Sequence, residues 1–267
     1  MTLDVLISTH GDEGLSKVEK MALPHIDGVR YVVSWQTHLI AAIADSPLSK
    51  RDDVKIIADN SGGLSRNRNR AIARASADIC LIADNDLTYT EPQLRQVVET
   101  FEANPDIDIA TFMYEGEDNK SYPDHTFDLS QPPRGYWVTS FEIAFRHEAV
   151  AKSGVKFNEL FGIGAPVLGA AEEELFIAQC LKAGLKGRFF PIVITRHNGN
   201  TTGIRGLNDP KVMRSKGAYH ALVHPCTYRL RLALEAYRRS RNGISPFWSS
   251  YRTFMEGARY IKKNNKK

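Results

Sequence analysis

The segment "GLSRNRNRAIARASADICLIADND" (residues 63–86) decides the fold, because an arginine-rich stretch leads directly into an apolar run that ends in two acids. Ser65 can cap a helix over the arginines, and "DICLIA" (78–83) has the length and continuous apolar character of a strand covered on both faces. Asp84 and Asp86 follow where that strand would reach the surface. A hydrogen-bonded turn or a bound cation could each explain the two carboxylates.

Further apolar runs of strand length occur at residues 3–9, 29–35, 54–58 and 108–113. Thr90 and Gln93 form a capping box for a helix over 91–103, with Pro92 in its first turn. Residues 169–197 supply another helix, a stop at Gly184 and a last strand that ends at His197. This alternation predicts an α/β fold with a mainly parallel sheet sandwiched by helices, whose ligands lie beyond the carboxyl ends of the strands.

The composition is that of an ordinary globular chain of 267 residues, 42% hydrophobic and 25% charged. Its net charge of +4 is unevenly distributed, since residues 229–267 contain eleven basic side chains and two acidic ones. We therefore expect a catalytic domain over 1–205 and a basic helical region over 206–267, whose partner is an anionic surface. No recognised nucleic-acid module accompanies this charge, so a membrane is favoured over nucleic acid.

No apolar run is long enough to span a bilayer, and the N-terminus lacks the features of a signal peptide. These observations predict a cytoplasmic protein, with a peripheral contact to the inner face of the cell membrane through the basic tail. The competing interpretation of that tail is a helical appendage that packs its aromatic residues on the catalytic domain and leaves its charges in solvent.

Four features of the sequence could take part in binding or catalysis. Asp84 and Asp86 are oxygen ligands suited to Mg²⁺ or Mn²⁺. Gly62 and Gly63 precede a helix whose N-terminus could attract phosphate. Glu172, Glu173 and Glu174 open a helix, where they either interact with its dipole or include a general base. A lone histidine such as His197 is more often structural than a ligand.

The order of these clusters resembles that of the family 2 glycosyltransferases with the GT-A fold, which are inverting enzymes that use nucleotide-activated sugars. The matching stretches are "VLISTH" (5–10), residues 63–86, and "GAPVLGAAEEELFIAQCLKAGLKGRFFPIVITRH" (164–197). In that family an R-N pair opens the helix before the D-x-D strand, an acidic pair follows a loop of small residues, and a histidine often follows the last strand.

The resemblance implies roles for individual residues. It implies a metal site for Mn²⁺ or Mg²⁺ at Asp86, Asp84 and His197, and a catalytic base drawn from Glu173 and Glu172. The residues implied to bind the nucleotide-sugar are Ser8, Thr9, Gln36, Asp59, Arg68, Asp84 and Asn85. Two departures concern the base: the acidic pair is Glu-Glu, and "SWQTH" stands where the family commonly has an aspartate, so that Ser34 or Gln36 must replace it.

The resemblance thus implies an enzyme that transfers a sugar, most readily from a UDP-sugar, to a hydroxyl of a glycan or a lipid-linked acceptor. The polar segments 115–135 and 198–203 are candidates for closing over the donor. A sugar-phosphate nucleotidyltransferase is a competing prediction, but that class usually has a glycine-rich loop and a lysine directly after the first strand. Here the nearest such lysine is the distant Lys17. A non-catalytic glycan-binding partner with the same fold is the third possibility.

Overall fold

A computed structural model of the chain describes residues 1–117, 120–197, 206 and 208–265. The chain divides into two compact units. The first, here called the sheet unit, comprises residues 1–62, 66–156 and 179–200, and the second, the helical unit, comprises 63–65, 157–178 and 201–267. The domain boundary expected at residue 205 lies outside the described residues.

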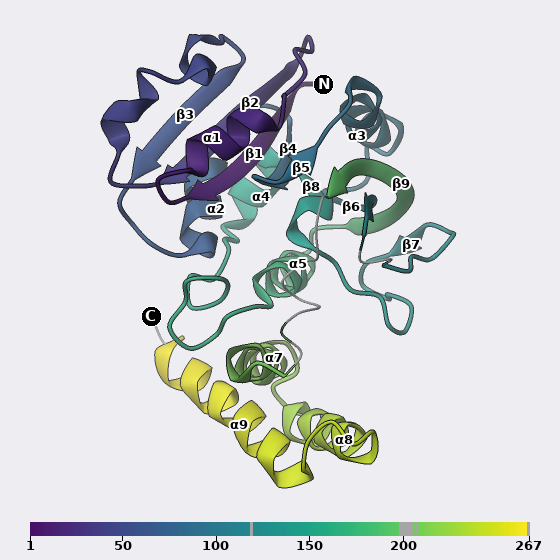
Figure 1. The fold of residues 1–267 in the computed structure, drawn as a ribbon. Coiled ribbons are helices and arrows are strands. Elements are labelled where there is room, and N and C mark those ends of the chain that lie inside the picture. Colours follow the sequence, from purple (N-terminus) through teal and green to yellow (C-terminus); the bar gives the residue numbers. More distant parts are fainter. Residues whose placement is uncertain (118–119, 198–205, 207, 266–267) are drawn as a thin grey trace. The chain divides into compact units, whose positions relative to one another are not determined.

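Nine strands of the described chain form one sheet in the sheet unit (Figure 1). Its first half is parallel, in the order β3-β2-β1-β4. These strands are β1 (Leu3–His10), β2 (Val29–Gln36), β3 (Val54–Asp59) and β4 (Ile79–Asp84). Each lies within about a residue of its predicted range, because continuous runs of β-branched and other apolar side chains mark strands that are covered on both faces.

The second half of the sheet is mixed. β8 (Ile143–Arg146) runs antiparallel between β4 and β6 (Ile109–Gly116). β9 (Gly187–His197) pairs with β6 in parallel and also pairs, antiparallel, with β5 (Leu87–Thr88) and β7 (Phe127–Asp128). The α/β fold is therefore confirmed. β8 lies within residues 135–150, where the sequence predicts a strand and the start of a helix, but its antiparallel direction was not predicted.

Helices flank this sheet. The α-helices are α1 (Gly14–Lys20), α2 (Leu64–Ile72), α3 (Glu91–Ala103), α4 (His147–Ser153) and α5 (Glu172–Lys182), and the short 3₁₀ helices are η1 (Ile40–Ile43), η2 (Pro47–Lys50) and η3 (Ser140–Glu142). α3 has the predicted bounds and the predicted capping box between Thr90 and Gln93. The prediction that Ser65 caps α2 is wrong. The helix already begins at Leu64, and the Ser65 hydroxyl donates to the carbonyl of Phe161.

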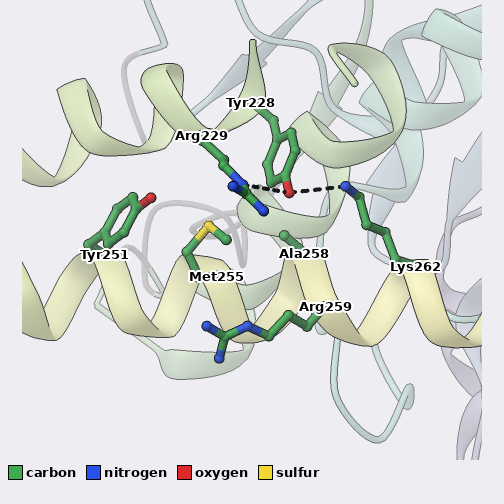
Figure 2. Close-up of a pocket in the computed structure, with 7 residues that line it drawn as sticks. All are labelled: Tyr228, Arg229, Tyr251, Met255, Ala258, Arg259 and Lys262. Atoms are coloured by element: carbon green, nitrogen blue, oxygen red, sulfur yellow. Dashed lines mark hydrogen bonds between the residues drawn. The ribbon is translucent and has the colours of Figure 1, made fainter. Parts of the chain in front are cut away.

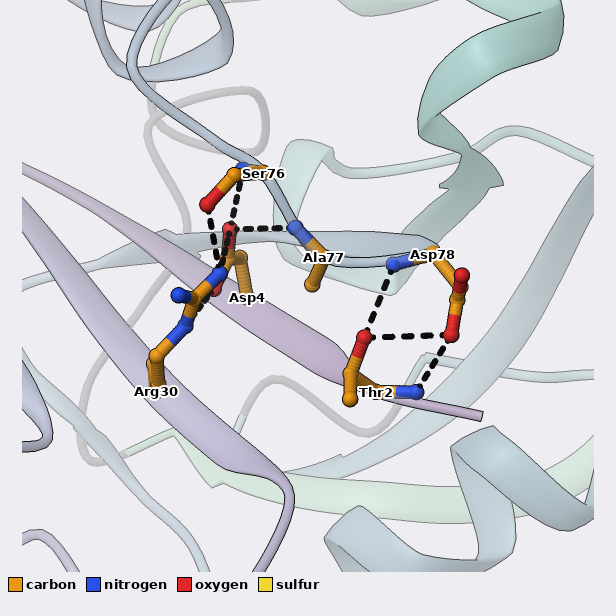
Figure 3. Close-up of polar contacts among 6 residues, drawn as sticks. All are labelled: Thr2, Asp4, Arg30, Ser76, Ala77 and Asp78. Atoms are coloured by element: carbon orange, nitrogen blue, oxygen red, sulfur yellow. Dashed lines mark hydrogen bonds and ion pairs between the residues drawn. The ribbon is translucent and has the colours of Figure 1, made fainter.

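A hydrogen-bonded cluster fixes the amino-terminal edge of the parallel strands (Figure 3). The buried Asp4 carboxylate of β1 accepts from the Arg30 guanidinium of β2 and from the backbone N–H groups of Ser76 and Ala77. Beside it, the backbone N–H of Thr2 donates to the Asp78 carboxylate just before β4. Because this edge is tied by charge-assisted bonds, the opposite, carboxyl edge is the one left for a ligand.

The helical unit contains α7 (Pro210–Val223), α8 (Tyr228–Arg241) and α9 (Phe247–Asn264). α7 and α9 approach closely at two glycines, since a Cβ on Gly217 would lie 1.8 Å from the Phe254 carbonyl oxygen and one on Gly257 would lie 1.9 Å from that of Arg214. A separate apolar core fills this unit, with Leu232, Phe254 and Ile261 almost fully buried. Among the described residues, none of the helices has both the length and the apolar character needed to cross a bilayer.

Candidate active site

The carboxyl edge of the parallel strands gathers several residues that the sequence singled out. Ser8 lies beside Asp84 of β4 on one side and Ser34 of β2 on the other. Gln36, at the end of β2, lies beside Asp59 at the end of β3. Parallel strands in register end at the same edge, so side chains far apart in the sequence come together here. The Ser8 hydroxyl is buried and has no hydrogen-bond partner within the described chain.

Thr9 and Asn85 bind one another across this edge. The Asn85 side-chain amide donates to the Thr9 hydroxyl oxygen at 2.6 Å, and that hydroxyl donates to the Gly14 carbonyl at 3.0 Å. The Asn67 amide of α2 donates to the Thr9 carbonyl at 3.0 Å. These bonds explain the middle residue of the D-x-D motif, because Asn85 ties the turn after β4 to the end of β1.

Arg68 lies beneath the first aspartate. Its guanidinium is 2% exposed and donates to the Asp84 carboxylate at 3.1 Å and to the Ser140 hydroxyl at 2.7 Å. Ser140 lies 3.3 Å from the other oxygen of the same carboxylate. Arg68 was predicted to bind the nucleotide, and the structure places it where it fixes Asp84 and neutralises its charge.

Asp86 and His197 form the second part of the edge. Asp86 is 53% exposed, and one carboxylate oxygen lies 3.3 Å from Nε2 of His197, whose side chain is 7% exposed. Pairing of β5 with β9 brings them together, since Leu87 lies opposite His197. The imidazole stacks on Phe141 at 5.3 Å between ring centroids and meets Tyr114 edge-on at 6.2 Å. These rings fix the imidazole so that Nε2 points at Asp86.

The donor set at this position fits a divalent cation. Asp86 offers an accessible carboxylate, which suits Mg²⁺ and Mn²⁺, and His197 offers an imidazole, which suits transition-metal ions, so the pair favours Mn²⁺ over Mg²⁺. Asp84, Asp86 and His197 do not bring their ligand atoms within 4.8 Å of one another, whereas those of His25, Asp52 and Asp53 do among the described residues.

The cluster of His25, Asp52 and Asp53 has an explanation without a metal. The Arg51 guanidinium already binds Asp53 through two nitrogens, at 2.8 and 2.6 Å. His25 lies 3.0 Å from the same carboxylate. The hydrogen bond from Arg51 is the main cause of the lowered pKa of Asp53. A carboxylate paired in this way is a weak candidate for a metal ligand.

Asp59 is held by α2 from the other side. The Arg70 guanidinium contacts its carboxylate and also donates to the Ser34 hydroxyl at 2.9 Å, while the Ser61 hydroxyl donates to Asp59 at 2.7 Å. Burial is the largest single influence and raises the pKa of Asp59, but the bonds from Arg70 and Ser61 together outweigh it and leave the pKa below its ordinary value. The lowered pKa favours the ionised form of Asp59, in which both carboxylate oxygens accept hydrogen bonds and neither donates.

A buried ion pair, missed in the sequence, anchors the residues around Ser140. Lys120 and Glu142 are 2% and 0% exposed, and the ammonium donates to both carboxylate oxygens, at 2.8 and 2.6 Å. The Tyr122 hydroxyl and the Thr139 backbone N–H donate to the same carboxylate. The stretch "TSFE" (139–142) has the S/T-x-x-E capping pattern and was the available signal for this turn.

This anchoring bears on the loop expected to close over the donor. Residues 120–122 of the segment 115–135 are tied down by Glu142, and Tyr122 stacks on Phe189 with 6.2 Å between ring centroids. Residues 118–119 of that loop and the whole segment 198–203 lie outside the described residues. The closing role of both segments stays a prediction.

The three glutamates lie in the helical unit, at the start of α5. Glu172 is 5% exposed, and its carboxyl lies 3.0 Å from where a Cβ on Gly162 would be. Gly162 has φ +98°, so both its backbone conformation and its close approach to Glu172 require glycine. Glu173 and Glu174 are half-buried. The loop of small residues before α5 thus covers the first glutamate and leaves the second more accessible.

Comparison with known proteins agrees with this geometry. Residues 37–156, from the end of β2 through α4, match the family model described as Glycosyl transferase family 2. Over this segment the chain is similar to glycosyl transferase family 2. The segment contains Asp59, Arg68, Asp84 and Asp86, so the D-x-D edge lies within the matched part of the family 2 sequence. No curated protein matches the chain.

Solved structures show the same fold. S. aureus TarS 1–349 is 15% identical, with a TM-score of 0.59 over 94% of this chain and 81% of that one. The structure of TarS 1–349 in complex with UDP-GlcNAc is 14% identical, with a TM-score of 0.60 over 94% and 82%. The longer TarS structure is 15% identical, with a TM-score of 0.57 over 94% and 49%. The GT-A fold predicted from the sequence is thereby confirmed.

Proposed function

We propose that the protein is an inverting glycosyltransferase that moves a sugar from a nucleotide-sugar donor to a hydroxyl of a glycan or lipid-linked acceptor. The observation that supports this most directly is the convergence of Asp59, Asp84 and Asp86 at the carboxyl edge of parallel strands, inside the family 2 segment. TarS, which shares the fold, has been solved with UDP-GlcNAc, so a UDP-sugar is the first donor to test.

On the donor side, the carboxylates of Asp59 and Asp84 have different proposed roles. Asp59 and Gln36 lie at the ends of β3 and β2. The Asp59 carboxylate is positioned to accept hydrogen bonds from the base of the nucleotide, and the Gln36 amide to donate to it. Asp84, held by Arg68 and Ser140, has two fixed oxygens that can accept from ribose hydroxyls. Thr9 and Asn85 hold the backbone of the edge in place. Arg68 acts as a positioning residue, because its guanidinium is buried.

Asp86 and His197 are the residues that would hold a divalent cation. When bound, Mn²⁺ would neutralise charge that builds up on the departing diphosphate. The remaining chemistry belongs to the chain. Phe141 and Tyr114 fix the orientation of His197 by ring contacts, and Asp86 presents its carboxylate to solvent at the same edge.

For the acceptor, Glu173 is the proposed base. A sugar hydroxyl is a poor nucleophile, so a carboxylate must take its proton as its oxygen attacks the anomeric carbon and the bond to the nucleotide diphosphate breaks. Attack from the face opposite the leaving group inverts the anomeric centre in one displacement. Glu173 is preferred to Glu172 because Glu172 is 5% exposed and covered by Gly162, whereas Glu173 is half-buried.

The donor is tested by thermal shift of the full chain with UDP-, GDP-, CMP- and dTDP-sugars, each with and without Mn²⁺. A bound donor raises the melting temperature by mass action. At a donor concentration of 100 times its dissociation constant, the free energy of unfolding increases by about 2.7 kcal/mol. One nucleotide class should stabilise the protein, and the same donor should be consumed with release of its nucleotide, which is a nucleoside diphosphate for UDP-, GDP- and dTDP-sugars and CMP for CMP-sugars. A chain that binds the donor but never turns it over with any acceptor would contradict the enzymatic proposal.

Asp86→Ala should abolish transfer and remove the Mn²⁺-dependent part of donor binding. Asp106→Ala is the matched control, because Asp106 is also a surface aspartate, at 55% exposure against 53% for Asp86. The control should keep both properties. An Asp86→Ala protein that stays active and responds to Mn²⁺ would rule out the metal assignment.

Glu173→Gln should leave donor affinity nearly unchanged while turnover falls by about two to four orders of magnitude, the usual contribution of a general base. Glu91→Gln, which changes another first-turn glutamate on α3, is the control and should behave like the unmodified protein. If Glu172→Gln shows the loss of turnover and Glu173→Gln does not, the base is Glu172.

A further inference from the structure

The solvent side of α8 is apolar. Leu230, Leu234 and Tyr237 are 64%, 48% and 56% exposed, and their spacing of four and three residues places them on one face. The opposite face, with Leu232 and Ala236, is buried in the core of the helical unit. A surface helix normally places polar residues outward, so this second apolar stripe is suited to a partner.

α8 and α9 carry many exposed cations and few acids. The two acids of residues 229–265 are both engaged by α7: Glu235 pairs with Lys216 at 2.6 Å, and Glu256 pairs with Arg214 at 3.2 Å. Within the described residues, no ion pair to a carboxylate forms at the following exposed or groove-lining cations of α8 and α9: Arg229, Arg231, Arg238, Arg241, Arg252, Arg259, Lys262 and Lys263. The exposed surface of α8 and α9 is therefore strongly positive, and on α8 it includes the helix that carries the apolar stripe.

A pocket of about 510 Å³ lies between α8 and α9 (Figure 2). Its lining residues are Tyr228, Arg229, Tyr251, Met255, Ala258, Arg259 and Lys262. The Lys262 ammonium and the Arg229 Nε both donate to the Tyr228 hydroxyl, at 3.0 and 3.2 Å, and the hydrogen bond from Lys262 is the main cause of the lowered pKa of Tyr228. Three cations on an apolar floor make this pocket complementary to a phosphate group.

We propose that α8 and this pocket together dock onto a membrane rich in anionic phospholipid. Leu230, Leu234 and Tyr237 enter the interface between headgroups and acyl chains, and Arg229, Arg259 and Lys262 bind a lipid phosphate. The proposal rests on the lipid-linked acceptor of the proposed function, and it assigns to named residues the membrane contact expected of the basic tail. Of the aromatic and apolar residues after 245, Phe254 and Met255 are 1% and 9% exposed, whereas Trp248 is 75% exposed, so that segment can contribute to the same contact.

Charge and shape favour a bilayer over two other occupants. A second copy of the chain would place the same arginines against one another, since a two-fold interface is made of one patch twice. A soluble polyanion would use the cations but would leave the apolar stripe in water. Only a surface with both anionic headgroups and an apolar interior uses both features.

The test is co-sedimentation of the full chain with vesicles of phosphatidylcholine alone and of phosphatidylcholine with phosphatidylglycerol. Binding should require the anionic lipid and weaken as salt rises. Leu230→Ser with Leu234→Ser should weaken binding at least ten-fold, as should Arg259→Gln with Lys262→Gln. Matched controls in the sheet unit are Leu39→Ser with Ile40→Ser and Arg95→Gln with Lys152→Gln, which alter exposed residues and should bind as the unmodified protein does.

Several outcomes would overturn the proposal. These are no binding to anionic vesicles, equal loss in the controls, saturable binding of inorganic phosphate without vesicle binding, and a dimer in sedimentation velocity that Leu230→Ser with Leu234→Ser dissociates. The thermal shift with the UDP-sugar is measured on the same preparations. If it persists while vesicle binding fails, the docking surface is wrong and the donor site is unaffected.

Discussion

Replacing Lys120 by methionine tests whether a buried ion pair holds the site together. Lys120 is 2% exposed and contacts both oxygens of Glu142, which is 0% exposed. Methionine keeps most of the volume and the apolar contacts with the Trp137 ring, whose centroid lies 4.1 Å from the ammonium. The substitution therefore removes one charge and leaves the Glu142 carboxylate buried, with the Tyr122 hydroxyl and the Thr139 N–H as its remaining donors among the described residues.

The expected cost is large because the remaining charge has no access to water. Removing one partner of a buried pair costs about 3–5 kcal/mol of folding free energy. For a domain of this size, each kcal/mol lowers the melting temperature by about 2–4 °C, so Lys120→Met should melt about 6 to 20 °C lower. Replacing both charges should cost much less than this, since Lys120→Met with Glu142→Gln leaves no buried charge at all.

Chemical denaturation followed by tryptophan fluorescence is the measurement, since Trp137 lies against the lysine. Lys152→Met is the control, because Lys152 is 74% exposed and its pair with Glu148 lies on the surface of α4, and it should change nothing measurable. The double variant must be more stable than Lys120→Met alone. If it is less stable, or if Lys120→Met costs no more than the control, the pair is not a buried one and the reasoning fails.

Two further predictions concern the helical unit. Gly217→Ala should lower the free energy of unfolding by about 1–3 kcal/mol, near the upper end of that range, because its Cβ would lie 1.8 Å from the Phe254 carbonyl oxygen. Gly62→Ala is the control, since its Cβ would meet nothing within 4 Å, and it should cost far less in the same denaturation assay. Lowering the pH from 7 to 5 should remove about 2 kcal/mol of stability, because burial lowers the pKa of His220 to about 4 and the unfolded chain takes up the proton first. Between pH 7 and pH 5, the His220→Gln protein should lose about 2 kcal/mol less stability than the unmodified protein. An equal loss in both proteins would show that His220 is not the group responsible.

The parallel half of the sheet could be predicted from the sequence, because strands that are buried on both faces consist of unbroken runs of apolar residues. β1, β2 and β4 are such runs, whereas β3 lies at the edge of the sheet and is only partly buried, and α3 carries an explicit capping box at Thr90. The position of the site followed from the same argument, since parallel strands deliver their last residues to one edge. Ser8, Asp59 and Asp84 needed no information beyond strand order to be placed together.

The contacts between side chains at that edge could not be predicted. Three arginines alternate along α2, and nothing local distinguishes Arg68, which is buried under Asp84, from Arg70, which reaches Asp59. The outcome depends on Ser140, which lies 72 residues away from Arg68 along the chain. Lys120 and Glu142 were missed for a similar reason. A charged side chain is expected to be exposed unless a buried partner for it is known, and here the partners lie in different segments of the chain.

The two acids of the D-x-D motif differ because their surroundings differ. Asp84 is paired with a buried guanidinium, so its charge is compensated inside the protein before any ligand arrives. Asp86 is 53% exposed, and the side chain nearest to its carboxylate is the His197 imidazole at 3.3 Å rather than an arginine or lysine. A dication would therefore be drawn to Asp86, while Asp84 keeps its geometry whether or not a metal is present. We expect the loss of Arg68 to alter donor affinity without metal as well as with it, and the loss of Asp86 to alter only the metal-dependent part.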